Sequence, residues 1–256
     1  MSLPLQLVEL AEPPEPGARV ELRGAEAHHA VAVRRLRPGE QVLFTDGRGW
    51  RGLIVVEATD RRLLVGRVLQ ADLLPEPRPR VVVVQALPKG EHADRAVALL
   101  TEVGAAVIVP WAASRCVTQW RAERAERAVE KWRHGAAEAA KQSRRLWFPQ
   151  VAELASTAEV LGLVSAATTA IVLHEASGGP IAEVPVPESG EIVIVVGPEG
   201  GLTDEEVAAL AAAGAAQVRL GDEVLRTSTA GVVAVAALLA RTARWGGSDH
   251  PPGTAR

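Results

Sequence analysis

The chain has 256 residues, of which 48% are hydrophobic and 23% charged, as expected for a globular protein of one or two domains. Its formal net charge is −3, and its single cysteine, Cys116, excludes an internal disulfide framework. The first residues lack the basic stretch of a secretion signal, and the longest apolar run, residues 229–240, is shorter than the roughly 20 residues that span a bilayer. These features predict a cytoplasmic protein that does not cross a membrane.

The charges are distributed unevenly along the chain. Residues 78–150 hold 13 Lys and Arg against 7 Asp and Glu, whereas residues 151–256 hold 5 against 13. A basic stretch of this kind attracts a phosphate-rich partner such as RNA. A solvated amphipathic helix carries the same charges, so charge alone leaves both interpretations open.

Residues 1–72 are predicted to form a small β-rich domain. Three short runs rich in β-branched residues predict strands, at residues 41–46, 52–58 and 63–69. Gly47 and Gly49 predict a turn between the first two strands, and a short helix is expected at residues 26–35. Short strands at this spacing favour a small barrel.

A proline-rich linker, residues 73–79, is expected to be extended because three prolines fall within five residues. Beyond it, residues 80–245 alternate apolar runs with helical patterns, which predicts an α/β domain with a parallel sheet. Strands are expected at residues 81–86, 107–110, 170–175, 192–196 and 217–220. Helices are expected at residues 91–103 and 122–142 and from residue 228 or 229 to 240. The Gly- and Pro-containing tail, residues 246–256, is predicted to be disordered.

One loop of the second domain has the pattern of a ligand site. It follows an apolar strand, contains Gly197, Gly200 and Gly201, and leads to Thr203, a good helix N-cap with Glu206 three residues later. In α/β sheets, small ligands bind where a strand passes through such a loop into a helix. The loop has neither the GxxxxGK[ST] pattern of nucleotide P-loops nor the GxGxxG dinucleotide pattern. A simple strand-to-helix turn without a ligand remains the alternative.

A second loop, LGDEVLRTSTAG at residues 220–231, also joins a strand to a helix. Together with GPEGGLT at residues 197–203, it resembles the signature of the SPOUT methyltransferases that modify N3 of a uridine in 16S ribosomal RNA. The runs HHAVAVRRLRPGE, LPKGEHADRAVALLTEVGA and EAAKQSRRLWFP resemble further elements of the same family. The resemblance implies a PUA-like RNA-binding β-barrel followed by an α/β domain with a trefoil knot. It also implies that S-adenosylmethionine is the cofactor, that the small ribosomal subunit is the partner, and that the protein forms a homodimer through the knotted domain.

The resemblance also implies the residues of the sites. The cofactor, held mostly by backbone groups, is expected to contact Leu173, His174, Gly197, Gly200, Gly201, Leu220, Gly221, Leu225, Thr227 and Ser228. RNA contacts are expected from His29, Arg34, Arg35, Arg37, Lys89, Arg115 and Arg145, although plain solvation of each cation is the alternative. No His or Cys cluster has metal-ligand spacing, so no metal is expected.

Attack by uridine N3 requires the loss of its proton, and the resulting negative charge spreads onto O2 and O4. Arg226 is the candidate that would stabilise this charge, with a structural ion pair as the alternative role. Glu199 is a weaker candidate for the base and could instead orient the glycine loop. Three residues depart from the family pattern, namely Lys141 and Ser228, which stand where glutamate is common, and Glu223, which stands where arginine or another residue is frequent. A mechanism that needs a carboxylate at position 228 is therefore excluded.

Two other functions are compatible with the sequence. One is a SPOUT enzyme that acts on transfer RNA or on a ribose 2′-hydroxyl, against which the PUA-like first domain and the LRT motif argue. The other is an RNA-binding assembly protein that retains the fold without the activity. Binding of S-adenosylmethionine distinguishes the second alternative from an enzyme.

Overall fold

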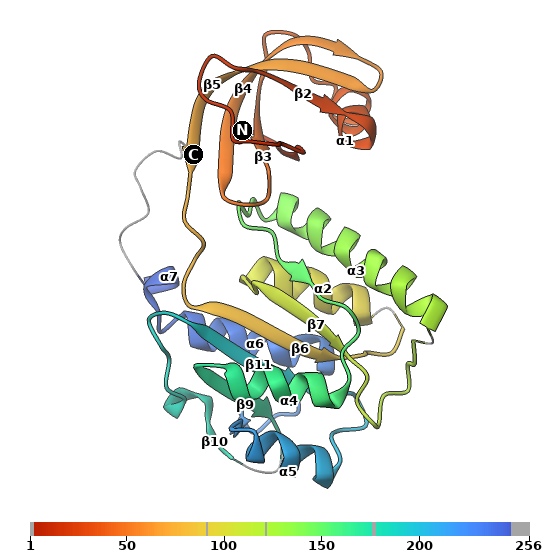
Figure 1. Ribbon diagram of the computed structural model, residues 1–256, viewed down its shortest axis with the longest axis vertical. Coiled ribbons are helices and arrows are strands. Elements are labelled where there is room, and N and C mark those ends of the chain that lie inside the picture. The colour runs from red at the N-terminus through yellow and green to blue at the C-terminus, as the bar shows by residue number, and fades with distance from the viewer. Residues whose placement is uncertain (1–2, 91, 121, 176–177, 247–256) are drawn as a thin grey trace. The chain divides into compact units, whose positions relative to one another are not determined.

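The computed structural model describes residues 3–90, 92–120, 122–175 and 178–246 (Figure 1). They divide into two compact units, one of residues 3–76 together with 141–148, the other of residues 77–140 and 149–246. The short segment 141–148 therefore belongs to the first unit although more than 60 residues of the second unit precede it. Apart from Gly246, the predicted tail lies outside the described residues.

The first unit is built on a five-stranded sheet in the order β1-β3-β4-β5-β2. Its strands are β1 Leu5–Leu7, β2 Arg19–Arg23, β3 Gln41–Thr45, β4 Trp50–Asp60 and β5 Leu63–Leu73. Register shifts between β4 and β5 at Leu53/Ile54 and Val56/Ala58 mark β-bulges, which bend a sheet. The sheet encloses a core that contains Phe44 and Trp50. No pairing joins β1 to β2 in the described part of the chain, so the predicted barrel is a half-barrel.

The helix predicted at residues 26–35 forms as two short pieces, α1 (Gly24–His28) and a π-helical turn, η1 (His29–Val33). The turn ends when Arg35 adopts a positive φ of 58° and the amide of Leu36 donates to the carbonyl oxygen of Ala30 at 3.1 Å. This closure is typical of a helix C-terminus, where glycine is the usual residue. An arginine at positive φ costs on the order of 1 kcal/mol, and such strain often accompanies functional sites.

Segment 141–148 joins the first unit through several specific contacts. The ammonium group of Lys141 pairs with Glu26 at 2.5 Å, the indole of Trp147 donates to the Leu74 carbonyl at 2.9 Å, and the amide of Phe148 donates to Gly47 O at 2.9 Å. Gly49 lies among these groups with φ +103°, and its amide donates to Leu146 O at 2.9 Å.

Replacement of Gly49 by alanine is expected to destabilise the first unit by about 2–3 kcal/mol. The added Cβ would lie 2.5 Å from Leu74 O and 2.8 Å from the Trp147 ring. Urea unfolding followed by tryptophan fluorescence measures this loss. The matched control is Gly39→Ala, because Gly39 has φ +92° and no atom within 4 Å of its added Cβ. An equal decrease in the free energy of unfolding in the two variants would contradict the close packing of segment 141–148 around Gly49.

The second unit contains a seven-stranded sheet in the order β10-β12-β9-β11-β6-β7-β8, in which every pairing is parallel. Its strands are β6 Arg80–Ala86, β7 Val107–Trp111, β8 Gln150–Val151, β9 Thr169–Leu173, β10 Gly179–Pro180, β11 Glu191–Val196 and β12 Ala216–Arg219. Its helices are α2 His92–Val103, α3 Ala122–Gln142 (whose last two residues join the first unit), α4 Thr157–Ala166, η2 Ile181–Glu183, α5 Asp204–Ala212, α6 Thr227–Leu239 and α7 Ala243–Gly246.

Helices cover both faces of this sheet, with α2 and α6 packed together on one face and α4 and α5 on the other (Figure 1). Burial on both faces explains why β6 and β11 are continuous runs of valine and isoleucine rather than alternating patterns. Gly231 lets α6 approach both the sheet and α2 closely, because a Cβ there would lie 3.1 Å from Val196 of β11 and 3.3 Å from Leu100 of α2.

The strand order indicates where the sheet is expected to bind a ligand. Along the chain, β6, β7 and β8 extend the sheet in one direction, after which β9 begins on the other side and β11 fills the place between β9 and β6. Ligands in open α/β sheets bind at such a reversal, outside the carboxyl ends of the strands. The loops that follow β9, β11 and β12 meet at this carboxyl end of the sheet.

Candidate active site

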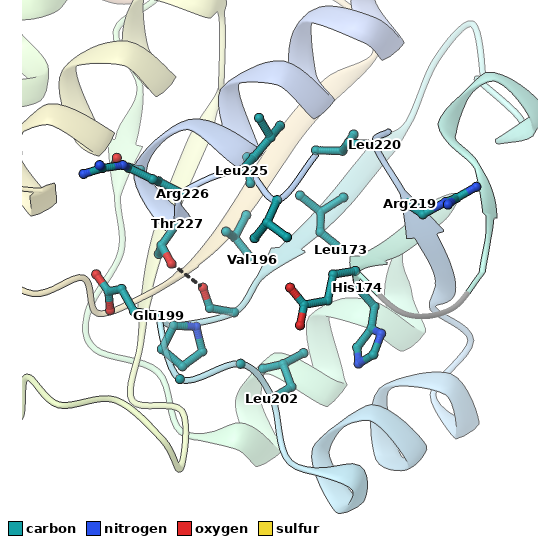
Figure 2. Close-up of a pocket in the computed structure, with 18 of the residues that line it drawn as sticks. Leu173, His174, Val196, Glu199, Leu202, Arg219, Leu220, Leu225, Arg226 and Thr227 are labelled. Carbon is teal, nitrogen blue, oxygen red and sulfur yellow. Dashed lines mark hydrogen bonds between the residues drawn. The ribbon is translucent and has the colours of Figure 1, made fainter. Parts of the chain in front are cut away.

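A cavity of about 740 Å³ lies at the carboxyl ends of β9, β11 and β12 (Figure 2). Its volume is within the usual range of small-ligand sites. Its walls include all ten residues that the sequence predicts to contact the cofactor, namely Leu173, His174, Gly197, Gly200, Gly201, Leu220, Gly221, Leu225, Thr227 and Ser228. Both catalytic candidates, Glu199 and Arg226, line it as well. Three separate loops therefore converge on a single cavity.

The cavity has an apolar side. Figure 2 shows the side chains of Leu173, Val196, Leu220 and Leu225 close together where β9 and β11 end. Val196 and Leu202, which are buried, were not predicted as lining residues. Their apolar character did not distinguish them from core residues, and only their position beside Gly197 and Gly201 could have indicated them.

The glycine loop between β11 and α5 is held by groups from three other segments. The hydroxyl of Thr227, at the start of α6, donates to Gly197 O at 3.2 Å (Figure 2). The carboxylate of Glu199 accepts a hydrogen bond from the backbone amide of Lys89, after β6, at 3.0 Å. The guanidinium of Arg115, after β7, donates to Leu202 O at 2.9 Å. The loop is thus fixed to its neighbours.

The two catalytic candidates differ in their contacts. One carboxylate oxygen of Glu199 is engaged by Lys89, which favours the role of orienting the loop. Arg226 is the N-cap residue of α6, is exposed, and forms no ion pair with the described residues. In Figure 2 its side chain extends away from Leu220 and Leu225, on the side of the cavity where Glu199 lies. The described residues therefore offer Arg226 no partner for the structural ion pair that was its alternative role.

The predicted RNA contacts fall in both units. His29, Arg34, Arg35 and Arg37 are exposed on η1 and the turn after it, and Arg145 lies in segment 141–148 of the same unit.

Lys89 and Arg115 belong to the second unit, and only Arg115 lines the cavity. The guanidinium of Arg115 binds backbone carbonyls of the glycine loop, so its position offers a structural role besides RNA contact.

Cys116 is buried and follows Arg115 directly. Burial raises the pKa of its thiol, and the nearby carboxylates of Glu199 and Glu206 add to this effect. A thiol with a raised pKa is a poor nucleophile at neutral pH. Cys116 therefore packs as a small apolar residue.

The described residues contain no group of three or more His, Cys, Asp or Glu side chains arranged to hold a metal ion. Among their helices, none is both long and apolar enough to cross a membrane.

Comparisons with known proteins agree with this architecture. Residues 75–239 match the family model of an RNA methyltransferase domain, and residues 22–69 match that of an RNA methyltransferase PUA domain. The ribosomal RNA small subunit methyltransferase E of Mycobacterium tuberculosis is 44% identical over 239 residues, which cover 92% of this chain and 91% of that protein. The protein of the same name from Bacillus subtilis is 29% identical over 86% of this chain and 90% of its own length.

A crystal structure of ribosomal RNA small subunit methyltransferase E from Neisseria gonorrhoeae, bound to S-adenosyl methionine, superimposes with a TM-score of 0.84 at 26% identity. The match covers 94% of this chain and 98% of that one. Both the PUA-like first domain and the parallel α/β second domain that the sequence predicts are therefore confirmed. The chain belongs to the family of RNA methyltransferases with a PUA domain that includes the ribosomal RNA small subunit methyltransferases E.

Proposed function

We propose that this protein transfers a methyl group from S-adenosylmethionine to N3 of a specific uridine in the 16S RNA of the small ribosomal subunit. The observation that carries the proposal is the convergence of the glycine loop and the LRTSTA loop on one cavity at the switch point of the sheet. Family membership supports methyl transfer to RNA, and the names of the relatives support ribosomal RNA as the substrate. The choice of N3, like the trefoil knot, rests on the resemblance of the loop motifs.

The cavity fits S-adenosylmethionine in size and chemistry. Its apolar side chains suit the adenine ring and the methylene groups, and its glycines bring backbone amides and carbonyls close to a ligand. When bound, the cofactor supplies an electrophilic methyl group on a sulfonium. The protein contributes the alignment of the uridine with that methyl group, and such positioning supplies much of the rate enhancement of a bimolecular reaction.

We propose that Arg226 stabilises the negative charge that develops on the uridine. As N3 loses its proton, negative charge grows on O2 and O4, and a guanidinium near either oxygen stabilises it. Arg226 lines the cavity and is unpaired with the described residues, so it is available for this contact. The carboxylate of Glu199 accepts a hydrogen bond from the Lys89 amide, so we propose that it orients the loop. We propose that water accepts the proton of uridine N3.

The first unit is proposed to bind the RNA backbone. Arg34, Arg35 and Arg37 are exposed cations in one turn, and Arg35 is held there at a strained positive φ. Phosphate contacts of this kind fix the register of a protein on RNA without reading its sequence.

We also propose a homodimer through the second unit. Most of α6 is buried within one chain, but Val233 on this helix is 40% exposed. An apolar helix with one uncovered side is expected to be covered by a second copy. Light scattering at micromolar concentration should give about twice the 27.0 kDa mass of one chain. A mass of one chain would refute the dimer and leave the methyltransferase proposal standing.

The function is tested by mass spectrometry of nucleosides from 16S RNA. A strain that lacks the gene should lose one N3-methyluridine, and the restored protein should bring it back. Loss of a 2′-O-methyl group or of a transfer RNA nucleoside would instead support a SPOUT enzyme with another RNA substrate. No change in any nucleoside, together with no calorimetric binding of S-adenosylmethionine, would support an RNA-binding assembly protein.

A further inference from the structure

Glu206 makes contacts that a helix cap does not require. It is the third residue of α5, and its carboxylate oxygen Oε2 accepts a hydrogen bond from the amide of the N-cap residue Thr203 at 3.0 Å. Its other oxygen, Oε1, accepts from the amide of Ser114, in the loop after β7, at 2.8 Å. The side chain thus connects two loops that are 92 residues apart in the chain.

The capping box of α4 shows what capping alone needs. There, Glu159 accepts hydrogen bonds from the amide and the hydroxyl of Ser156, at 2.8 and 2.7 Å, and remains exposed. By contrast, Glu206 is only 5% exposed. Burial of a carboxylate is costly unless its oxygens receive hydrogen bonds, and the amides of Ser114 and Thr203 provide them.

Arg115 completes the connection to the glycine loop. It follows Ser114 directly, and its Nη1 donates to Leu202 O at 2.9 Å and, at the longer distance of 3.4 Å, to Gly200 O. A Cβ on Gly200 would lie 3.3 Å from both the Cβ and the carbonyl oxygen of Arg115. Glu206, Ser114, Arg115 and the glycine loop therefore form a closed ring of contacts.

We propose that Glu206 is a positioning residue that, through Ser114 and Arg115, holds the glycine loop in the shape that binds the cofactor. The Glu206 carboxylate fixes the backbone from which Arg115 reaches the carbonyls of Gly200 and Leu202. These carbonyls belong to the loop that lines the cavity. Loss of the contacts made by Glu206 or Arg115 would therefore allow the glycine loop to adopt other conformations. The inference rests on the proposed function only in taking S-adenosylmethionine as the ligand of the cavity.

Cys116 supplies a readout that is independent of catalysis. It is the single cysteine of the chain, it is 8% exposed, and it lies two residues after Ser114 in the loop that Glu206 holds. The rate at which a disulfide reagent such as DTNB modifies the folded protein therefore reports how often this loop opens.

The experiment compares Glu206→Ala, Glu206→Gln and Arg115→Ala with the control Glu159→Ala. Loss of a buried hydrogen-bonded charge is expected to raise the Cys116 modification rate and the Kd for S-adenosylmethionine roughly tenfold or more in Glu206→Ala. Glu206→Gln keeps one acceptor oxygen and should lie between this variant and the parent protein. Arg115→Ala should weaken cofactor binding similarly, whereas Glu159→Ala should leave both quantities within about twofold, because α4 lies outside the ring.

Several results would overturn the inference. Equal Cys116 rates and equal Kd values in the Glu206→Ala and Glu159→Ala proteins would reduce Glu206 to a helix cap. If Glu206→Ala does not fold, the other two variants decide. Cys116 modification rates and Kd values equal to those of the parent protein in both Glu206→Gln and Arg115→Ala would likewise reduce Glu206 to a helix cap. If even the parent protein does not bind S-adenosylmethionine, the proposed function fails, and the Cys116 rates still decide whether the ring holds the loop.

Discussion

Replacement of Gly201 by valine is expected to abolish binding of S-adenosylmethionine and to leave the protein folded. Gly201 has φ +70°, and the only atom near an added Cβ is Arg115 Nη1 at 3.9 Å. An added Cβ therefore has room among the described residues, and because Gly201 lines the cavity, the valine side chain is expected to occupy space that the cofactor needs. The positive φ adds about 1–3 kcal/mol of strain for a β-branched residue, which further displaces the loop. Together these effects should weaken binding at least ~100-fold, or about 2.7 kcal/mol.

The matched control for this substitution is Gly214→Val. Gly214 also has a positive φ, of 106°, and no atom within 4 Å of its added Cβ, but it follows α5 and does not line the cavity. Both variants should lose stability in thermal unfolding, and calorimetry should show that only Gly201→Val loses the cofactor. Unchanged affinity in Gly201→Val would mean that the glycine loop is only a turn.

Much of the second unit could be predicted because its signals are local. The helix predicted at residues 122–142 is α3, with the same bounds, and the run predicted at residues 192–196 is β11 with one added residue. Buried parallel strands appear as continuous β-branched runs, and capping boxes or glycines mark the ends of helices. The cavity could also be predicted, because its walls are the loops that directly follow such strands.

Other features of the fold escaped prediction. β1 has only three residues, which is too short for an alternating pattern to show, and β2 has five. α4 was missed although Ser156 and Glu159 form a capping box that marks its start.

Membership of segment 141–148 in the first unit depends on contacts such as the one between Lys141 and Glu26, 115 residues apart. Lys141 occupies a position where the family often has glutamate, and a second carboxylate there would face Glu26 and repel it. The departure from the family pattern therefore has a local electrostatic reason in this chain.

The same limit applies within the site. Arg115 was predicted from the family resemblance to contact RNA. Its hydrogen bonds to Gly200 O and Leu202 O emerge only once β7 and β11 are placed in one sheet. Glu206 was predicted as a helix cap, which it is, but its second hydrogen bond reaches a loop that no local pattern connects to it. A residue with one local and one distant role shows only the local role in the sequence.

The final prediction separates RNA docking from catalysis. Replacement of Arg34, Arg35 and Arg37 by alanine should weaken RNA binding and leave the affinity for S-adenosylmethionine unchanged, because the cofactor cavity belongs entirely to the other unit. Each lost phosphate contact should make the log–log dependence of affinity on salt shallower by about 0.7–0.9. Since a shallower line falls less steeply, the loss of affinity should be largest at low salt. Binding isotherms at several salt concentrations measure both quantities.

Arg226→Ala should have the opposite effect. If its guanidinium stabilises the developing oxyanion, the substitution should raise the barrier by ~2–4 kcal/mol, which lowers the single-turnover methylation rate by about 30- to 900-fold. RNA affinity should change less, because Arg226 is one cation at the cavity and not part of the basic turn of the first unit. Arg226→Lys is the matched control, since it keeps the charge and loses the planar fork of donors, so partial recovery would indicate that charge carries part of the effect. If Arg226→Ala methylates saturating RNA at the parent rate, Arg226 has a structural role and the oxyanion must be stabilised by another group.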